Sequence, residues 1–237
     1  MTISKELLKT LASKNGIELD DKALDRFDTY AEKLIYWNER INLTAITDPE
    51  EIVYKHFLDS LMVLKYVDIP EGASLIDVGT GAGFPGLALL IARPDLKVTL
   101  MDSTNKKLNV IRDILEALSL EANVVHARAE EAGQDPDFRE QYDFSTARAV
   151  SNLRDLSEYC LPFVRKHGTF ISMKGPEAQD ELEIARKAIG VLGGTPDEPL
   201  IYDLEDKGTR AIVTIKKHKH TPQKYPRRGT VIKKQPI

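Results

Sequence analysis

Cysteines and long apolar runs are nearly absent from this sequence. The single cysteine, Cys160, cannot form an internal disulfide and is typical of a protein kept in a reducing compartment. The longest clearly apolar run, residues 86–92, is far shorter than the ~20 residues that span a bilayer. The first residues, MTISKELLKT, lack the apolar core of an export signal. We therefore expect a cytoplasmic protein without a membrane segment.

The remaining composition is that of a folded domain. Of 237 residues, 42% are hydrophobic and 30% are charged, which excludes a disordered chain, a collagen-like chain and a disulfide scaffold. The length is sufficient for one large domain or two small ones with a substantial core.

Positive charge is concentrated at the C-terminus. The net charge is −4, but residues 216–237 contain eight Lys and Arg residues and no acid, so this segment carries +8 and the rest of the chain −12. A basic arm on an acidic body indicates either a polyanionic partner or a solubilising tail, and charge alone does not distinguish the two.

The first 69 residues predict helices only. Ser4 can cap a helix over residues 5–14, because its hydroxyl accepts a hydrogen bond from an otherwise unpaired amide. Residues 21–41 place apolar side chains at intervals of three and four, the pattern of an amphipathic helix. Pro49 suits the first turn of a further helix after Asp48. We expect residues 1–69 to form a helical extension.

From residue 70 onward, short apolar and β-branched runs alternate with helical stretches. This alternation predicts a parallel sheet in a doubly wound α/β domain, over residues 70–217, and the last two runs predict a closing hairpin with its turn at 205–208. A basic C-terminal arm follows over residues 218–237. The predicted strands are SLIDVGT (74–80), KVTLMDS (97–103), NVVHA (123–127), YDFSTAR (142–148), GTFISMKG (168–175), LIYDL (200–204) and TRAIVTIKK (209–217).

A glycine-rich loop, residues 79–86, joins the first predicted strand to its helix. Glycines there allow a sharp turn and a close approach of a ligand to the main chain. The spacing of Gly81, Gly83 and Gly86 matches the dinucleotide fingerprint. The spacing Asp77-x-Gly79-x-Gly81-x-Gly83 resembles motif I of the S-adenosylmethionine (SAM)-dependent methyltransferases.

Two features favour the methyl donor over a nicotinamide cofactor. Asp77 stands where a carboxylate could help hold the methionine end of SAM, and the methyltransferase fold, by resemblance, ends its sheet with an antiparallel strand. Asp102, which ends the second strand, could accept hydrogen bonds from ribose hydroxyls in either kind of site. An NAD(P)-dependent oxidoreductase therefore stays as the alternative.

The sequence also restricts the methyl acceptor. Methylation at a pyrimidine C5 needs a thiolate, but Cys160 lies among apolar residues and predicts a core position. The Asn/Asp-Pro-Pro-aromatic loop of exocyclic-amine methyltransferases is replaced by TARAV at 146–150. A ring nitrogen such as guanine N7 needs only alignment. Arg148 and Lys174, each at a strand end, could orient guanine and its phosphates; the alternative is two surface charges.

Several short stretches of the chain together resemble a known family, the 16S ribosomal RNA guanine-N7 methyltransferases (RsmG, or glucose-inhibited division protein B). The similarity runs through nearly the whole chain. The matching stretches are residues 37–38 (WN), 41–46 (INLTAI), 56–61 (HFLDSL), 77–86 (DVGTGAGFPG), 102–103 (DS), 129–131 (AEE), 148–149 (RA) and 174–175 (KG).

The resemblance implies a SAM-dependent enzyme that methylates N7 of one guanine in the 530-loop region of 16S rRNA and releases S-adenosylhomocysteine. The sequence leaves free rRNA and the small subunit open as the substrate, and nothing in it indicates an obligate oligomer, so we expect a monomer. It implies donor contacts at five positions, and the motif itself adds Gly81, Gly83 and Asp102. Segment 221–228 is similar to the family's basic arm, which implies RNA contacts by Lys224, Arg227 and Arg228, whereas residues 229–234 depart from it. The five implied positions are Gly79, Phe84, Ala129, Glu130 and Arg148.

Polar residues in the N-terminal extension have two interpretations. His56, Asp59 and Ser60 share one helical face and either line the RNA or cofactor entrance or hold the extension against the sheet. Asn38 and Asn42 either face RNA or brace the helix end. We predict that Trp37 is a core residue. We expect no metal site, because no Cys/His/Asp cluster accompanies His56.

The sequence thus predicts a Rossmann-like SAM-dependent methyltransferase fold, with a mainly parallel sheet, a closing antiparallel hairpin and a helical extension. A non-catalytic RNA-binding ribosome-assembly factor with the same fold is a third reading. It would bind rRNA through the arm without affinity for a cofactor.

Overall fold

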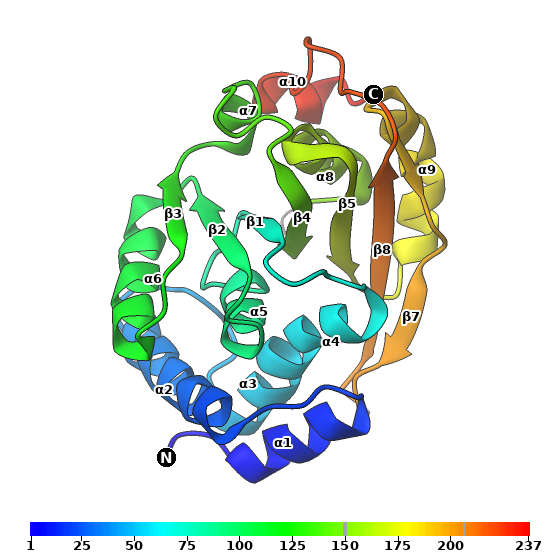
Figure 1. Cartoon of the computed structure of the whole chain (residues 1–237). Helices are drawn as coiled ribbons and strands as arrows, with labels where there is room; N and C mark the ends of the chain where they lie inside the picture. Colours follow the sequence, from blue (N-terminus) through cyan, green and yellow to red (C-terminus); the bar gives the residue numbers. More distant parts are fainter. Residues whose placement is uncertain (149–150, 206) are drawn as a thin grey trace.

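A computed structural model describes residues 1–148, 151–205 and 207–237 and is shown in Figure 1. Its strands form one eight-stranded sheet in the order β3-β2-β1-β4-β5-β8-β6, with β7 paired to β8. The strands are β1 (Ser74–Val78), β2 (Lys97–Asp102), β3 (Asn123–His126), β4 (Tyr142–Arg148), β5 (Val164–Lys174), β6 (Gly194–Pro196), β7 (Leu200–Asp203) and β8 (Thr209–Lys217).

The sheet confirms the predicted α/β class. Strands β1 to β5 run parallel, and β8 is antiparallel to β5, β6 and β7. Strand β6 was not predicted, because its three residues, Gly-Thr-Pro, have no strand pattern of their own and pair only with the end of β8. The predicted turn at 205–208 contains Asp206, which lies outside the described residues, as does Ala149 of the RA motif.

Helix starts follow the predicted capping chemistry. The Ser4 hydroxyl accepts from the Leu7 amide, and Asp48 accepts from the Glu51 amide, with Pro49 in the first turn. The helices are α1 (Lys5–Lys14), α2 (Asp21–Asn38), α3 (Pro49–Ile52), α4 (Asp59–Tyr66), α5 (Gly86–Ala92), α6 (Asn105–Leu118), α7 (Ala129–Ala132), α8 (Leu153–Cys160), α9 (Ala178–Val191) and α10 (Gly229–Lys234), with a π-helical segment η1 (Val53–Leu58) and a 3₁₀ turn η2 (Leu161–Phe163).

The predicted helix over residues 21–41 was too long. Helix α2 ends at Asn38, whose Oδ1 accepts hydrogen bonds from the amides of Leu43 and Thr44 at 2.8 and 2.9 Å. This side chain replaces the helical pattern with a turn, because it satisfies amides that a continued helix would pair internally. The structure therefore gives Asn38 a bracing role, whereas Asn42 is exposed.

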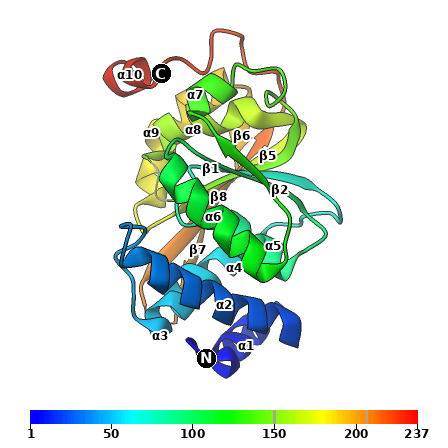
Figure 2. The same cartoon turned by 90° about the vertical axis from the view of Figure 1, so that its left-hand side faces the viewer.

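Two hydrophobic clusters cover the two faces of the sheet. Alternate residues of β1 separate them: Leu75 belongs to the cluster under α1–α6, and Ile76 to the cluster under α8 and α9. Figure 2 shows α5 and α6 on the first face, with α2 lying beside them. Cys160 is fully buried in the second cluster, as predicted, and Trp37 packs against the first.

The N-terminal helices share a core with the sheet domain. The Tyr30 ring lies 5.1 Å from that of Phe84, and Phe27 lies 4.8 Å from Phe57. The segment between β7 and β8 also contacts the extension, because Lys207 in that segment pairs with Glu51. Among the described residues, no helix is both long and apolar enough to cross a membrane.

The C-terminal arm begins later than the charge pattern suggested. Lys216 and Lys217 belong to β8, and Lys217 is fully buried. Its ammonium donates to Glu140 and to the carbonyl oxygens of Leu161 and Val164, and burial lowers its pKa to about 8. Lys217 therefore adds no accessible charge to the basic segment 216–237, and it lies within the predicted domain 70–217, ahead of the arm predicted at 218–237.

Because one core unites the two segments, we expect the fragment 70–237 not to fold alone. Removing residues 1–69 uncovers Phe84 and the outer surfaces of α5 and α6, which pack against α2. Circular dichroism should show a single cooperative thermal transition for the full chain and none for the fragment. A cooperative transition of the fragment would contradict the shared core.

Candidate active site

Three adjoining cavities lie at the carboxyl ends of β1, β2, β4 and β5. The strand-end cavity, about 170 Å³, is lined by Gly79, Asp102, Ala129 and Glu130, among others. The glycine-loop cavity, about 400 Å³, shares Gly79 and Asp102 with it and adds Thr44, His56, Gly81, Phe84 and Arg148. The cationic cavity, about 650 Å³, shares His56 and Arg148 with the second and adds Lys55, Asp59, Lys174, Glu181 and Arg210. Shared walls make the three a continuous site.

Contacts with the N-terminal extension fix the conformation of the glycine loop. The Tyr30 hydroxyl donates to the Ala82 carbonyl at 2.7 Å inside the core. Gly83 has a φ of +106°, and a Cβ there would lie 2.5 Å from the Tyr30 hydroxyl. A side chain at position 83 would therefore displace Tyr30 and strain the backbone. The extension thus sets the shape of the loop.

Asp77 shapes the same loop from below and lines none of the three cavities. It is fully buried, and its Oδ2 accepts from the Thr80 hydroxyl at 2.7 Å and the Gly86 amide at 2.8 Å. Its Oδ1 is buried without a hydrogen-bond partner among the described residues, and burial raises the pKa to about 6. The expectation of a ligand contact by Asp77 is thus corrected to a role in loop geometry.

Asp102 lies where the strand-end and glycine-loop cavities meet. Its Oδ2 accepts from the Gly81 amide at 3.0 Å and its Oδ1 from the Thr104 amide at 2.8 Å. Each carboxylate oxygen keeps a lone pair for a further donor. The carboxylate is therefore fixed in place and still able to accept hydrogen bonds from a pair of hydroxyl groups.

Arg148 connects the glycine-loop cavity with the cationic cavity. Its side chain is 14% exposed, and Nη1 donates to Asp59 and to the Lys55 carbonyl, both at 3.1 Å. The Asp59 carboxylate, which is itself buried, also accepts from the Tyr202 hydroxyl at 2.9 Å. The guanidinium lies 4.8 Å from the centre of the Phe84 ring. The alternative of a surface charge is excluded.

His56 is a neutral partner of Arg148. Its Nδ1 lies 3.2 Å from Arg148 Nη2, and because a guanidinium only donates, Nδ1 must accept. The proton is then on Nε2, which donates to the Thr44 hydroxyl oxygen at 2.9 Å. Burial and the charge of Arg148 lower the pKa of His56 to about 3. Its ring stacks on Phe84 at 4.5 Å, so the buried Phe84 side chain supports both residues.

The π-helical segment explains how these groups reach Arg148. In η1 the Asp59 amide donates to the Tyr54 carbonyl, five residues earlier, instead of the Lys55 carbonyl. The Lys55 carbonyl accepts from Arg148. The predicted face of His56, Asp59 and Ser60 is split accordingly: His56 and Asp59 line the cationic cavity, while Ser60 bonds back to the His56 carbonyl.

The side chain of Lys174 is also largely buried, with 7% of it exposed. Its ammonium donates to the Ser151 carbonyl at 2.6 Å and pairs with Glu181 Oε2 at 2.7 Å. One N–H of Lys174 and the second oxygen of Glu181 have no partner among the described residues. Because both residues line the cationic cavity, they can offer a ligand there one donor and one acceptor.

Sequence reasoning missed five residues of the site, because the fold brings them together from different elements. None has a local spacing signal; only Thr44, inside the matching stretch 41–46, could have been singled out. Of the predicted arm residues, Lys224 and Arg228 are exposed, whereas Arg227 pairs with Glu158. Among the described residues, no group of His, Cys, Asp and Glu could hold a metal ion. The missed residues are Thr44, Lys55, Glu181, Tyr202 and Arg210.

Comparison with known proteins decides the family. The family model for rRNA small subunit methyltransferase G matches residues 23–200. Ribosomal RNA small subunit methyltransferase G of Alkaliphilus metalliredigens is 46% identical over 236 residues, covering 99% of both chains. The Staphylococcus saprophyticus protein of the same name is 46% identical over 227 residues, covering 95% of both. The chain belongs to the rRNA small subunit methyltransferase G family.

Solved structures share the fold of this family member at low identity. A predicted O-methyltransferase from Agrobacterium tumefaciens superposes with a TM-score of 0.56 at 19% identity, over 68% of this chain and 81% of that one. A SAM-dependent O-methyltransferase from Thermotoga maritima gives 0.52 at 15% identity, over 80% of this chain and 72% of that one. These likenesses confirm the methyltransferase-like fold.

The buried Asp77 gives a pH dependence with a defined sign. Folded protein keeps the Asp77 proton up to about pH 6, whereas the ordinary pKa is 3.8. Its contribution to stability is therefore fully present below pH 3.8 and is lost as pH rises through 6, by an amount of the order of 3 kcal/mol. Asp77→Asn should remove this loss, as measured by urea unfolding between pH 4.5 and 7.5.

Asp95→Asn is the matched control for that measurement. Hydrogen bonding to Arg93 lowers the Asp95 pKa to about 2, so its own titration lies below the measured range. The pH profile of this variant should match that of the original protein. An unchanged profile in Asp77→Asn would contradict the raised pKa.

Proposed function

We propose that this protein transfers a methyl group from SAM to N7 of a guanine in the 530-loop region of 16S rRNA, in the cytoplasm. The observation that carries the proposal is the largely buried side chain of Arg148, which lines both the glycine-loop cavity and the cationic cavity. One fixed cation thus borders a compartment suited to a nucleoside donor and a compartment suited to an anionic acceptor. Family membership supports the same reaction class.

The residues of the first two cavities fit SAM. Asp102 has free lone pairs for the ribose hydroxyls, and Gly79, Ala129 and Glu130 border the narrow cavity beside it, which suits the adenine. The Thr44 hydroxyl accepts from both His56 and the Ile46 amide, so its own proton is left to donate toward the glycine-loop cavity. When bound, SAM supplies an electrophilic methyl group on a sulfonium.

The cationic cavity fits guanine and its phosphates. Guanine presents an acceptor at O6 and donors at N1 and N2, which match the open N–H of Lys174 and the open oxygen of Glu181. Arg148, Arg210 and Lys55 supply positive charge for the phosphates and O6. Guanine N7 has its own lone pair, so transfer needs alignment and exclusion of water, not a base. His56 agrees with this, because its accepting nitrogen is occupied by Arg148.

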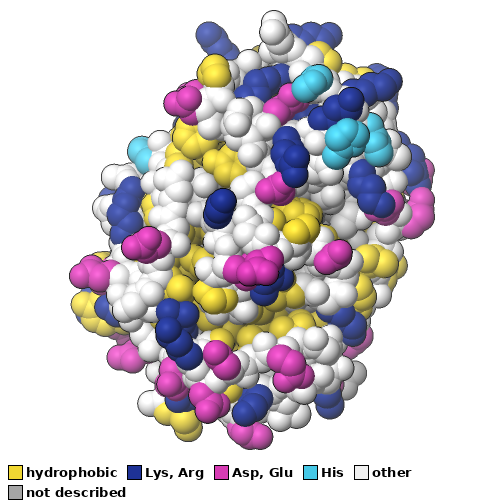
Figure 3. Space-filling view, in the orientation of Figure 1, with side chains coloured by type: hydrophobic (Ala, Val, Ile, Leu, Met, Phe, Trp, Pro, Cys, Tyr) yellow, Lys and Arg dark blue, Asp and Glu magenta, His cyan; other side chains and the backbone are white. Residues whose placement is uncertain are grey.

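The exposed cations of the tail support rRNA as the acceptor. Figure 3 shows Lys, Arg and His side chains dense over the upper part of this face, where the tail and α10 lie in Figure 1. Lys224 and Arg228 are exposed there. The two alternatives lack such support: the family is not one of oxidoreductases, and a non-catalytic assembly factor needs neither a fitted donor cavity nor a buried Arg148.

The decisive test maps N7-methylguanine in 16S rRNA. Chemical cleavage at methylated guanines is compared between cells with and without this gene. Loss of one cleavage in the 530 loop, restored by purified protein with SAM, is the expected result. An unchanged cleavage pattern of 16S rRNA would contradict the proposed acceptor.

Replacing Arg148 should slow methyl transfer, because its side chain borders both the glycine-loop cavity and the cationic cavity. Arg148→Ala removes the donor to Asp59 Oδ2 and to the Lys55 carbonyl, while Asp59 Oδ1 keeps the Tyr202 hydroxyl. We expect the single-turnover methylation rate to fall about a hundredfold or more. Arg148→Lys keeps the charge but not the fork of donors and should retain the fold, as checked by its melting temperature. A rate near that of the original protein in a folded Arg148→Lys variant would contradict the role.

The exposed cations of the tail should contribute a salt-dependent part of the affinity for rRNA, because they would neutralise phosphates. Lys224→Ala combined with Arg228→Ala should weaken rRNA binding and lower the slope of log affinity against log salt by roughly one to two units. Filter binding across a salt series measures the slope. Arg227→Ala is no substitute here, because it also breaks the pair with Glu158.

A further inference from the structure

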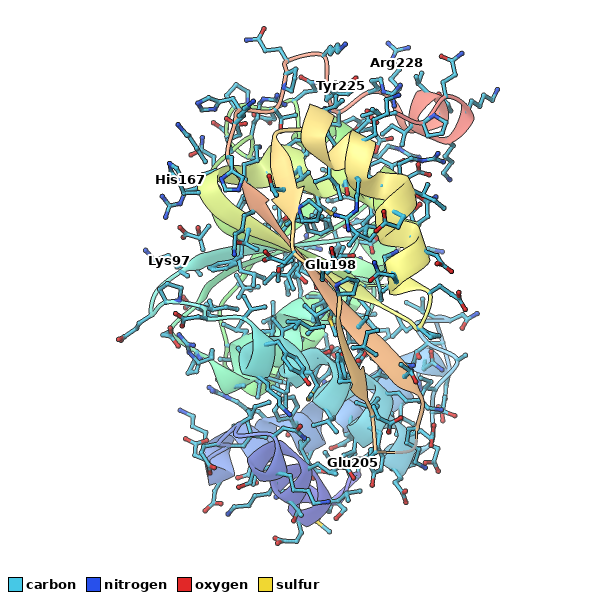
Figure 4. All side chains as sticks on the ribbon, turned by 90° about the vertical axis from the view of Figure 1, so that its right-hand side faces the viewer. Lys97, His167, Glu198, Glu205, Tyr225 and Arg228 are labelled. Carbon is cyan, nitrogen blue, oxygen red and sulfur yellow. The ribbon has the colours of Figure 1, made fainter. Side chains whose placement is uncertain are left out.

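The C-terminal tail is docked on the domain instead of hanging free. Tyr225 and Ile232 are buried. Arg227 Nε and Nη2 donate to the two oxygens of Glu158 at 2.8 and 2.6 Å, and the Glu158 side chain is 1% exposed. Figure 4 shows Tyr225 and Arg228 together at one end of the molecule, opposite Glu205. A buried carboxylate that depends on Arg227 fixes the course of the tail.

A second set of contacts ties the tail to the segment around α7. Arg139 donates to the Tyr225 and Thr221 carbonyl oxygens at 2.8 and 2.7 Å, and Gln134 donates to the Pro226 carbonyl at 2.9 Å. Pro226 sits on Gly133, where a Cβ would lie 2.8 Å from its Cγ. The tail is therefore seated on the helix that begins with Ala129 and Glu130, beside the strand-end cavity.

The seated tail reaches the wall of that cavity. The Gly229 amide donates to Glu130 Oε1 at 3.2 Å, and a Cβ on Gly229 would lie 2.6 Å from the same oxygen. One turn later, Lys233 lines the strand-end cavity together with Gly79, Asp102 and Glu130. Lys233 has no hydrogen bond or ion pair to the described residues, so its three N–H donors are available to a ligand.

We propose that α10 forms the outer wall of the adenosine site and that Lys233 contacts the bound nucleoside. The inference rests on the proposed function, because it takes the strand-end cavity as the place of the adenosine moiety. Acceptors on that moiety, the ring nitrogens and ribose oxygens, match the free ammonium of Lys233. Tail docking and donor binding then stabilise each other, since linkage between two binding events is reciprocal.

Two adjacent lysines separate this role from RNA binding. Lys233 lines the strand-end cavity, whereas Lys234 is exposed and lines none of the cavities described here. Replacing either lysine with alanine removes one positive charge from the same helix, α10. Calorimetric titration of the full-length protein with S-adenosylhomocysteine, without RNA, should show a Kd raised roughly three- to tenfold by Lys233→Ala. Lys234→Ala should leave the Kd within about twofold.

A glycine pair tests the docking itself. Gly229→Ala places a methyl group against Glu130 and should also raise the Kd for S-adenosylhomocysteine. Gly190→Ala in α9 is the control, because a Cβ at Gly190 meets nothing within 4 Å. Linkage adds a converse readout: saturating S-adenosylhomocysteine should slow tryptic cleavage after Lys234, and this protection should be weaker in Lys233→Ala.

The outcomes separate the inference from the proposed function. If the original protein binds no S-adenosylhomocysteine, the proposed function fails. If the original protein binds S-adenosylhomocysteine and the Lys233→Ala and Gly229→Ala variants bind it with the same Kd as the original, the proposed function stands and the role of α10 is overturned. If Lys233→Ala and Lys234→Ala weaken binding equally, the effect is one of general charge, and the proposed contact is also overturned.

Discussion

A largely buried guanidinium is the constraint around which this molecule is arranged. Arg148 ends a central parallel strand, and the carboxyl edge of the sheet alone cannot satisfy its donors. The missing acceptors come from the N-terminal extension: the Asp59 carboxylate, the Lys55 carbonyl and the His56 ring. Burial of a cation is tolerated only with such partners. These contacts tie the extension to the carboxyl edge of the sheet, and the π-helical segment leaves the Lys55 carbonyl available to Arg148.

The sequence predicts those parts of the structure that depend on local pattern. The β-branched runs around Val78 and Val213 and the caps at Ser4 and Asp48 each have a short-range signal, and the structure follows them. Helix α2 ended early because of Asn38, whose side chain competes with the helix in a way that periodicity does not register. Strand β6 exists only through its partner strand.

The sequence predicted the site residues that stand at strand ends, but not those that tertiary packing brings to the site. Arg148 and Lys174 stand at the ends of neighbouring parallel strands, so sequence order places them at one edge. Glu181 comes from a later helix and Tyr202 from an edge strand, and only the folded chain brings them to Lys174 and Asp59. Asp77 shows the reverse error, because a motif position suggested a ligand contact where burial imposes a loop-forming role.

The lone thiol of Cys160 has a consequence beyond packing. It is fully buried between α8 and the sheet, and burial raises its pKa far above the usual range, so both access and ionisation suppress its reactivity. Alkylating reagents can attack only when this layer opens. Because the chain has no other cysteine, the alkylation rate of unlabelled protein is a chemical clock for opening of the second core, without any introduced probe.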